Sequence, residues 1–186
     1  METTLYLVRH GEALGGEDDD PPLSELGRAQ ARAVGTRLAG LPFDEVLHGS
    51  RRRARETAEE IARGLDLRAV YTPHANDRTP IPADQSALTP ALREFLAAVP
   101  ADERDPAGVG LDTAMEELGR LGEVDHHVLA VTHNFVIGWV VRAALHAPTF
   151  EWTRLNSSNG ALTIVQFRSG QSPRLVAFND TGHLPD

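Results

Sequence analysis

The sequence predicts an α/β fold, a three-layer α/β/α sandwich around a mostly parallel sheet in which mixed strand directions are also allowed. Short apolar runs typical of buried strands alternate along the chain with segments of helical periodicity. Such alternation is typical of a sheet covered by helices on both faces. The length of 186 residues suits one domain. We therefore expect residues 1–186 to form a single domain, with a proline-rich cap or lid insertion around residues 73–110.

The first part of the chain shows strands and helices in turn. Ser24 precedes a segment of helical periodicity and can act as its N-cap. A loop rich in Gly and Asp separates this helix from the first apolar run. The expected elements are a strand over residues 3–8, a helix from Ser24 to about Ala39, a strand over 45–48, an arginine-rich helix over 52–63 and a strand over 67–71.

The pattern changes between residues 73 and 106, where prolines recur and little regular periodicity remains. A connection of this length within one domain is typical of a functional lid or cap. The regular pattern then returns. The further expected elements are a helix over residues 89–98, a helix over 111–121, a strand over 128–132, an apolar helix over 136–145, and paired strands over 162–167 and 175–178 joined by a turn at 169–171.

The composition excludes several classes of partner. A net charge of -9 argues against a general nucleic-acid surface. No apolar stretch reaches the length that spans a membrane, and the first residues do not form a signal peptide. The chain has no cysteine, which excludes disulfides and thiolate metal sites and favours a cytoplasmic location. We interpret the acidic run at residues 17–20 as a solvated loop rather than a metal site.

Two predicted strands each end in a histidine. The first is followed by Arg9-His10-Gly11-Glu12, and a later one by Thr132-His133. Ligands of open α/β sheets bind at the carboxyl ends of the strands. A neutral histidine can be a nucleophile, an arginine suits phosphate oxygens, and a glycine lets the backbone approach closely. The motif therefore points to phosphoryl chemistry with His10 as nucleophile and with Arg9 and Gly11 at the phosphate.

Arg-His-Gly-Glu after an N-terminal strand resembles the signature of the histidine phosphatase superfamily, which includes cofactor-dependent phosphoglycerate mutase. The segment from Arg53-Ala54 to Thr57-Ala58 is similar to the family's Arg-Ala-x-x-Thr-Ala. This register makes Arg53 the phosphate-binding arginine and treats Arg51, Arg52 and Arg55 as exposed helix charges. His133 matches the family's second histidine. Asn134 stands where the acid-phosphatase branch has an aspartate, which indicates the mutase-like branch.

The resemblance also implies a general acid in the middle insertion. The nearest match is the stretch from Glu103 to Gly108. Glu103 is the first choice, Asp105 the second, and Asp77 the third. Among the remaining histidines, His126 and His127 are expected to form a surface pair before a strand. Whether His48 or His183 contacts the substrate is left open.

The resemblance and the residues together favour a metal-independent phosphomonoesterase that acts through a phosphohistidine on a small phosphorylated metabolite. No cofactor and no metal are expected. A phosphoglycerate mutase-type phosphotransferase is less favoured, because the loop after His10 lacks the Asn and Arg that would hold a second acidic group. The cap insertion argues against a protein phosphohistidine phosphatase. A catalytically silent phosphate-binding protein stays open, as do the oligomeric state and the physiological substrate.

Overall fold

The computed structural model describes residues 1–16, 19–86 and 88–185, and it has a central six-stranded sheet in the order β3-β2-β6-β1-β7-β8. Parallel pairing joins β3, β2, β6 and β1, whereas β7 and β8 run antiparallel. The sheet is therefore mixed. Its strands are β1 (Glu2–Arg9), β2 (Glu45–His48), β3 (Ala69–Tyr71), β6 (His126–Thr132), β7 (Leu162–Arg168) and β8 (Arg174–Asp180).

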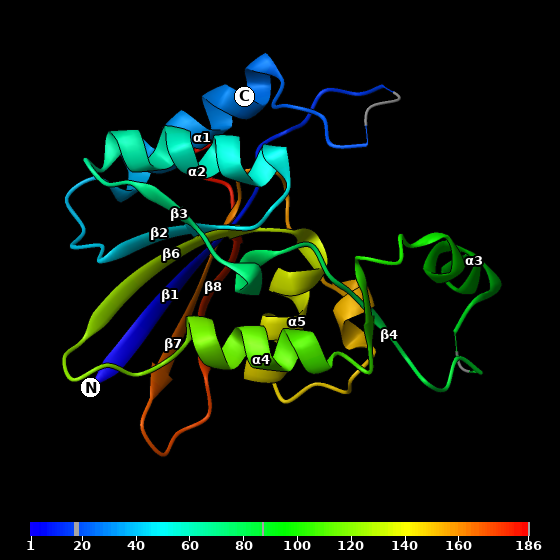
Figure 1. Cartoon of the computed structure of the whole chain (residues 1–186). Coiled ribbons are helices and arrows are strands. Elements are labelled where there is room, and N and C mark those ends of the chain that lie inside the picture. Colours follow the sequence, from blue (N-terminus) through cyan, green and yellow to red (C-terminus); the bar gives the residue numbers. More distant parts are fainter. Residues whose placement is uncertain (17–18, 87, 186) are drawn as a thin grey trace.

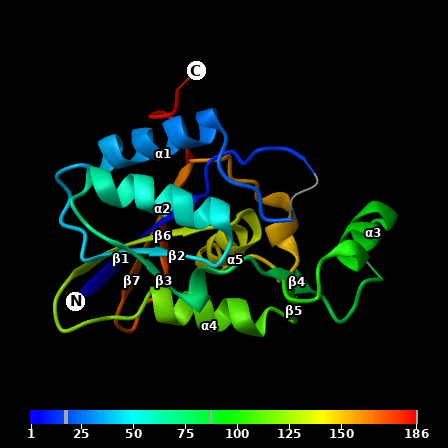
Figure 2. The same ribbon diagram turned by 45° about the horizontal axis from the view of Figure 1, so that its top comes forward.

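Helices cover both faces of this sheet, as the two ribbon views show (Figures 1 and 2). α1 (Glu25–Leu38) and α2 (Arg52–Gly64) lie on one face, while α4 (Val109–Leu118) and α5 (Asn134–Ala144) lie on the other. Ser24 caps α1, since its side chain accepts from the backbone N–H of Gly27. The three-layer α/β arrangement expected from the sequence is confirmed.

The alternation of side chains along β1 explains why the sheet can be covered on both faces. Tyr6 and Val8 belong to the apolar core with α1 and α2, whereas Leu5 and Leu7 belong to the core with α5. Successive side chains of a strand point to opposite faces. A strand that is apolar at every position is consequently buried on both sides.

The insertion after β3 contains short elements that lie outside the main sheet. It contains the 3-10 turn η1 (Pro73–Ala75), β4 (Thr79–Ile81), α3 (Pro90–Ala98) and β5 (Arg104–Pro106), and β4 pairs with β5 in parallel. Figure 1 shows α3 projecting to the side of the sandwich. Leu96 is its one fully buried side chain, and it belongs to a small core with Trp139 and Trp152.

Several expected boundaries shift in the structure. The strand expected over residues 67–71 begins at Ala69, and the helix expected over 111–121 is α4, which ends at Leu118. His126 and His127 do not precede a strand, because they are the first residues of β6. His127 is held there by ring contacts with Tyr6 and Phe43. The tight β4–β5 pair was not expected from the sequence.

A further 3-10 turn, η2 (Glu151–Arg154), follows α5. Among the described residues, no helix combines the length and apolar character needed to cross a membrane.

Candidate active site

The histidines at the ends of β1 and β6 lie side by side. These strands are parallel neighbours, with Arg9 in register with Thr132. The next residues, His10 and His133, therefore leave the same edge of the sheet, and their ring centroids are 5.1 Å apart. Both side chains are buried. Parallel pairing thus brings together two residues that are 123 positions apart in the sequence.

The contacts of His10 select one neutral form of its ring. Nδ1 lies 2.8 Å from the carbonyl oxygen of Gly11, which can only accept, so Nδ1 carries the proton. Arg53 Nε lies 3.2 Å from His10 Nε2 and can only donate, so Nε2 carries a lone pair. The ring consequently presents an unprotonated Nε2 toward the arginine, which is the form that a nucleophilic histidine requires.

Burial is the main reason that His10 is neutral. The pKa of the imidazole is lowered from 6.5 to about 3, mainly by burial and then by the neighbouring His133, Arg53 and Arg9, while the contact with Gly11 opposes this shift. A cation inside this cluster would face the charges of both arginines without the hydration of bulk water. His10 is therefore unprotonated throughout the physiological pH range.

Two arginines supply positive charge beside His10. Arg53 comes from the first turn of α2, and its side chain is only 16% exposed. Arg9 is the last residue of β1 and donates to the carbonyl oxygen of Ser157. Burial lowers the pKa of the Arg9 guanidinium from its ordinary value, against the attraction of Asp77. Arg52 points elsewhere, since its Nε donates to Glu56 at 2.7 Å. The structure thus places Arg53, not Arg52, at the site.

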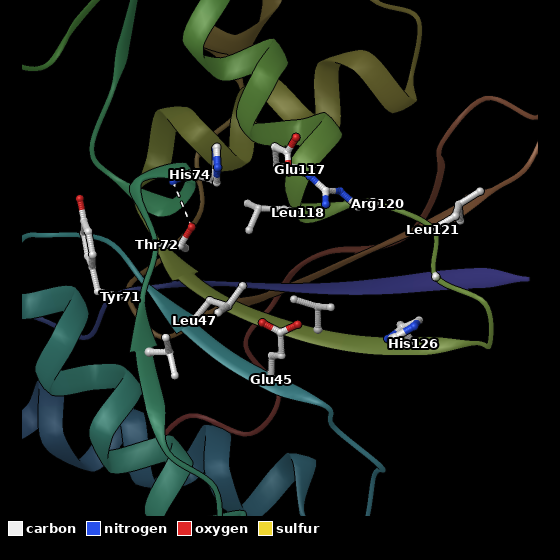
Figure 3. A pocket seen from close by; sticks show the side chains of 13 residues that line it. Glu45, Leu47, Tyr71, Thr72, His74, Glu117, Leu118, Arg120, Leu121 and His126 are labelled. Atoms are coloured by element: carbon white, nitrogen blue, oxygen red, sulfur yellow. Dashed lines mark hydrogen bonds and ion pairs between the residues drawn. The ribbon is translucent and has the colours of Figure 1, made fainter.

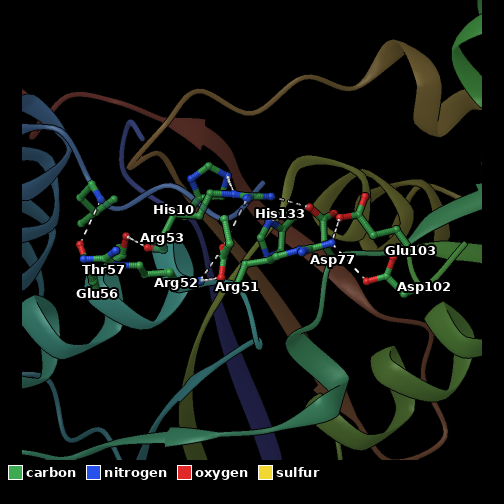
Figure 4. Close-up of polar contacts among 12 residues, drawn as sticks. His10, Arg51, Arg52, Arg53, Glu56, Thr57, Asp77, Asp102, Glu103 and His133 are labelled. Atoms are coloured by element: carbon green, nitrogen blue, oxygen red, sulfur yellow. Dashed lines mark hydrogen bonds and ion pairs between the residues drawn. The ribbon is translucent and has the colours of Figure 1, made fainter. Parts of the chain in front are cut away.

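Asp77 is the carboxylate that lies against this cluster (Figure 4). Its Oδ2 accepts from Arg53 at 2.9 Å and lies 3.0 Å from His133 Nδ1. The approach to His133 is not aligned as a hydrogen bond, and both ring nitrogens of His133 lack a well-aligned partner among the described residues. Burial alone would raise the pKa of Asp77, but His133 and Arg53 hold it at about 2. The free site therefore contains an ionised carboxylate between the Arg53 guanidinium and the His133 ring.

The first-choice acid, Glu103, makes a different contact. Arg51 donates to Glu103 and lies 3.3 Å from Asp102, so the three form an ion-pair group beside Asp77 (Figure 4). Arg51 was expected to be an exposed helix charge, which is wrong, because its side chain is 21% exposed and doubly paired. Glu103 and Asp77 do line the same two small hollows.

The second-choice acid, Asp105, stabilises the start of a helix. Its carboxylate accepts from the backbone N–H groups of Gly110 and Leu111 at 3.0 and 2.8 Å. The side chain is buried and caps the first turn of α4. This contact gives Asp105 a role in stabilising the start of α4 rather than a place in the histidine cluster.

Gly11 is required by a close approach to α1. A Cβ at this position would lie 2.5 Å from the carbonyl oxygen of Gly27. Its N–H donates at 2.9 Å to Oγ1 of Thr57, whose hydroxyl donates to the carbonyl oxygen of Arg53. Thr57 therefore couples the loop after β1 to the turn of α2 that carries Arg53. Sequence reasoning used Thr57 only to set the register and missed this positioning role.

A second hydrogen-bond network, which positions Arg9 and His10, was not predicted from the sequence. Asn159 donates to the carbonyl oxygen of His10 at 2.9 Å. Asn134 accepts from the N–H of Ser157, whose carbonyl oxygen accepts from Arg9. The polar run Asn156-Ser157-Ser158-Asn159 between two apolar segments was the available sequence signal. These contacts connect Arg9 and His10 to the segment of residues 156–159.

The two histidines left open by the sequence, His48 and His183, contact backbone carbonyl groups. His48 ends β2, and its Nδ1 lies 2.8 Å from the carbonyl oxygen of Gly49. His183 Nε2 lies 3.0 Å from the carbonyl oxygen of Gly160, next to Asn159. His183 therefore supports the loop that contacts His10. Of the acidic run, Glu17 and Asp18 lie outside the described residues, and Asp20 accepts from the N–H of Arg52 at the start of α2.

One sizeable hollow of the molecule does not contain the histidine cluster (Figure 3). It has a volume of about 410 Å³ and is lined in part by Glu45, Tyr71, Arg120 and His126. Glu45 and His126 begin β2 and β6, whereas the cluster lies where β1 and β6 end. Within the described ranges, no group of three or more His, Asp or Glu side chains is arranged to hold a metal ion.

Comparison with known proteins identifies the family. The model of the histidine phosphatase superfamily (branch 1) matches residues 5–109 and 110–181. The chain belongs to the histidine phosphatase superfamily. The family expected from the Arg9-His10-Gly11-Glu12 motif is thereby confirmed.

One relative of this chain is named as a protein phosphatase. Human mitochondrial serine/threonine-protein phosphatase PGAM5 is 30% identical over 188 residues, covering 97% of this chain and 63% of that protein. The chain thus spans less than two thirds of the length of this relative.

Two solved structures share the fold. YhfR from Bacillus stearothermophilus has a TM-score of 0.73 at 22% identity, over 98% of this chain and 100% of that one. A variant of phosphoserine phosphatase from Entamoeba histolytica, solved with phosphoserine, has a TM-score of 0.72 at 22% identity, also over 98% and 100%. At these identities the comparison shows the histidine phosphatase fold.

Proposed function

We propose that this chain is a phosphomonoesterase that needs no metal and acts through a phosphohistidine on His10, with a small phosphorylated metabolite as substrate. The observation that carries the proposal is the orientation of His10. Its unprotonated Nε2 faces Arg53, with His133 at a ring distance of 5.1 Å and Arg9 as the preceding residue. A nucleophile and the cations that stabilise an equatorial phosphoryl charge are therefore already assembled.

In the first step, His10 Nε2 attacks phosphorus while the ester P–O bond breaks. Arg9, Arg53 and His133 stabilise the charge on the phosphoryl oxygens. The proton stays on His10 Nδ1, and its hydrogen bond to the carbonyl oxygen of Gly11 favours the positive charge that forms on the phosphorylated ring. The leaving alkoxide takes a proton from a carboxyl group.

We propose Asp77 as that carboxyl group, in place of Glu103. Asp77 contacts Arg53 and His133, whereas Glu103 is paired with Arg51. In the free site, the pKa of Asp77 is about 2 because these two partners hold it down. A bound phosphate dianion takes over the same two partners and adds negative charge, and both effects raise the pKa of Asp77. Substrate binding thus favours the protonated form of Asp77, which can then act as the acid.

In the second step, water attacks the phosphohistidine and the P–N bond breaks. The Asp77 carboxylate, left ionised by the first step, accepts the proton of this water. Inorganic phosphate leaves, and His10 returns to its neutral form with Nδ1 protonated. We further propose that residues 73–110, which carry Asp77, Glu103 and α3, act as a cap beside the site.

The test is hydrolysis of 4-nitrophenyl phosphate by protein dialysed against EDTA. The wild-type chain is expected to release phosphate at the same rate with and without the chelator, and His10→Ala to be inactive. A requirement for an added divalent ion would contradict the assignment of the charge stabilisation to Arg9, Arg53 and His133. Vanadate, which adopts the five-coordinate geometry of the transition state, is expected to inhibit.

A second candidate is a serine/threonine-protein phosphatase. The observation in its favour is the 30% identity to human PGAM5 over 97% of this chain. The two candidates are separated by comparing kcat/KM for a phosphoserine peptide with kcat/KM for free phosphoserine. A much higher value for the peptide would favour the protein phosphatase, whereas similar or lower values support the metabolite phosphatase.

A further inference from the structure

The cap forms a small apolar hollow next to the acid. This hollow, called the cap hollow below, has a volume of about 170 Å³ and an apolar wall made by Phe95, Ala98, Val99, Pro100 and Phe135. Asp77, Glu103 and Thr79 complete its lining. Because Asp77 lies against His133 and Arg53, the cap hollow begins where the phosphate site ends.

Its wall joins the cap to the body of the fold. Phe95 belongs to α3 and Phe135 to α5, and their rings meet edge to face with centroids 5.7 Å apart. Phe135 is in turn supported by Trp152, at a ring distance of 5.0 Å. Phe95 nevertheless stays 44% exposed, so an apolar surface next to Asp77 remains open to solvent. A ligand in the cap hollow would cover it.

A second hollow on the other side of Asp77 is the alternative place for the organic part of the substrate. It has a volume of about 140 Å³ and contains two cations, Arg51 and Arg78, and three carboxylates, Asp77, Asp102 and Glu103. Arg51 is already paired with Asp102 and Glu103. When Asp77 is protonated as the acid, two carboxylates face two guanidinium groups, so this hollow has no excess positive charge for a second anionic group of the substrate.

We propose that the cap hollow binds an apolar group attached to the ester oxygen of the substrate, so that the preferred substrates are phosphate monoesters of hydrophobic alcohols. The inference rests on the proposed function and specifies its substrate class. When Asp77 protonates the leaving oxygen, the group on that oxygen extends along the wall that Asp77 shares with Phe135. The volume corresponds to roughly five or six water-sized groups, which matches a short alkyl chain or one aromatic ring.

The test uses ethyl, butyl, hexyl and octyl phosphate, whose alcohols are equally poor leaving groups. Each methylene that becomes fully buried is expected to raise kcat/KM by up to about fourfold. The gain is expected through hexyl and to stop at octyl, because the cap hollow is then full. Equal kcat/KM along the series, or a preference for phosphoserine or phosphoglycerate over hexyl phosphate, would overturn the inference while leaving the phosphatase proposal intact.

Two variants locate the effect. Ala98→Leu fills the cap hollow from an exposed position at the end of α3 and is expected to abolish the dependence on chain length without disturbing the core. Phe95→Ala is expected to weaken this dependence. The matched control is Phe150→Ala, because Phe150 is similarly exposed, at 48%, but does not line the cap hollow. A loss of the dependence in Phe150→Ala, or its persistence in Ala98→Leu, would place the apolar contact elsewhere.

Binding of alkylphosphonates, measured by calorimetry, makes the test independent of turnover. These compounds are not hydrolysed, so their affinity reports the cap hollow even if no ester is cleaved. Affinity that rises from ethyl- to hexylphosphonate in the wild type but not in Ala98→Leu supports the inference. Affinity that is flat along the series contradicts it. If phosphonates bind with the expected trend but no ester is hydrolysed, the proposed function fails and the binding site stands.

Discussion

The neutral state of buried His10 predicts a specific dependence of stability on pH. In the folded protein its pKa is about 3, against 6.5 for an ordinary imidazole. Between these values only the unfolded chain binds the proton, so the free energy of unfolding decreases as the pH falls below 6.5. At pH 5 the difference amounts to about 2 kcal/mol for this one group.

The perturbation is His10→Gln, which removes the titrating ring and keeps a polar side chain. The free energy of unfolding is measured by urea denaturation at pH 7.5 and pH 5 for both proteins. The wild type is expected to lose about 2 kcal/mol more than the variant between these two pH values. The other histidines occur in both proteins, so their contributions cancel. Asp77 also cancels, because at pH 5 a carboxyl group with an ordinary pKa of 3.8 is largely ionised even in the unfolded chain.

Equal losses in the two proteins would refute the reasoning, since His10 would then have the same proton affinity folded and unfolded. A larger loss in the variant would show that His10 is protonated in the folded state. Either result would remove the unprotonated Nε2 on which the proposed mechanism depends.

Two further predictions concern the residues around His10. Arg53→Ala is expected to reduce kcat by roughly 10²- to 10³-fold, as for the loss of one preorganised donor. Arg52→Ala is expected to change kcat little, because the Arg52 guanidinium binds Glu56. Equal losses in the two variants would mean that the phosphate contacts differ from those inferred. Asp77→Asn is expected to slow hydrolysis of alkyl phosphates far more than that of 4-nitrophenyl phosphate, because only a poor leaving group needs a proton. Glu103→Gln is expected to affect both esters alike, and the opposite pattern would make Glu103 the acid.

The fold and the proximity of His10, His133 and Arg53 could be predicted from the sequence, because both depend on local patterns. β1 and β6 are apolar at consecutive positions, and each is followed directly by its histidine. Once two such strands are parallel neighbours, their carboxyl ends meet at one edge, so His10 and His133 must be close. Arg53 follows in the same way from the position of the first turn of α2 after β2.

The position of Asp77 beside the histidines could not be predicted from the sequence, because tertiary contacts fix the segment that carries it. Asp77 follows η1, and this turn is held by Thr132, whose hydroxyl donates to the carbonyl oxygen of Ala75 at 3.0 Å. Asn76 accepts from the N–H of Ser50 at 2.8 Å. Gly49 allows the approach, since a Cβ there would lie 2.2 Å from the carbonyl oxygen of Ala75. None of these contacts leaves a periodic pattern in the sequence.

The ion pair of Glu103 could not be predicted from the sequence for a related reason. A charged residue in a proline-rich segment can be exposed, paired or catalytic, and the sequence does not distinguish these states. Its partner, Arg51, lies 52 positions away and looked like one of several exposed helix arginines. The apolar wall of the cap hollow could not be predicted from the sequence either, because Phe95 of α3 and Phe135 of α5 come into contact only in the folded chain.

The most direct test of the central claim is to identify the phosphorylated residue during turnover. Wild-type protein is mixed with excess 4-nitrophenyl phosphate, quenched rapidly under alkaline conditions that preserve phosphohistidine, digested and analysed by mass spectrometry. The account predicts a phosphate on the peptide that contains His10, formed as fast as nitrophenol is first released, and none in His10→Ala. A phosphate on His133, or continued turnover with no phosphorylated histidine, would contradict it.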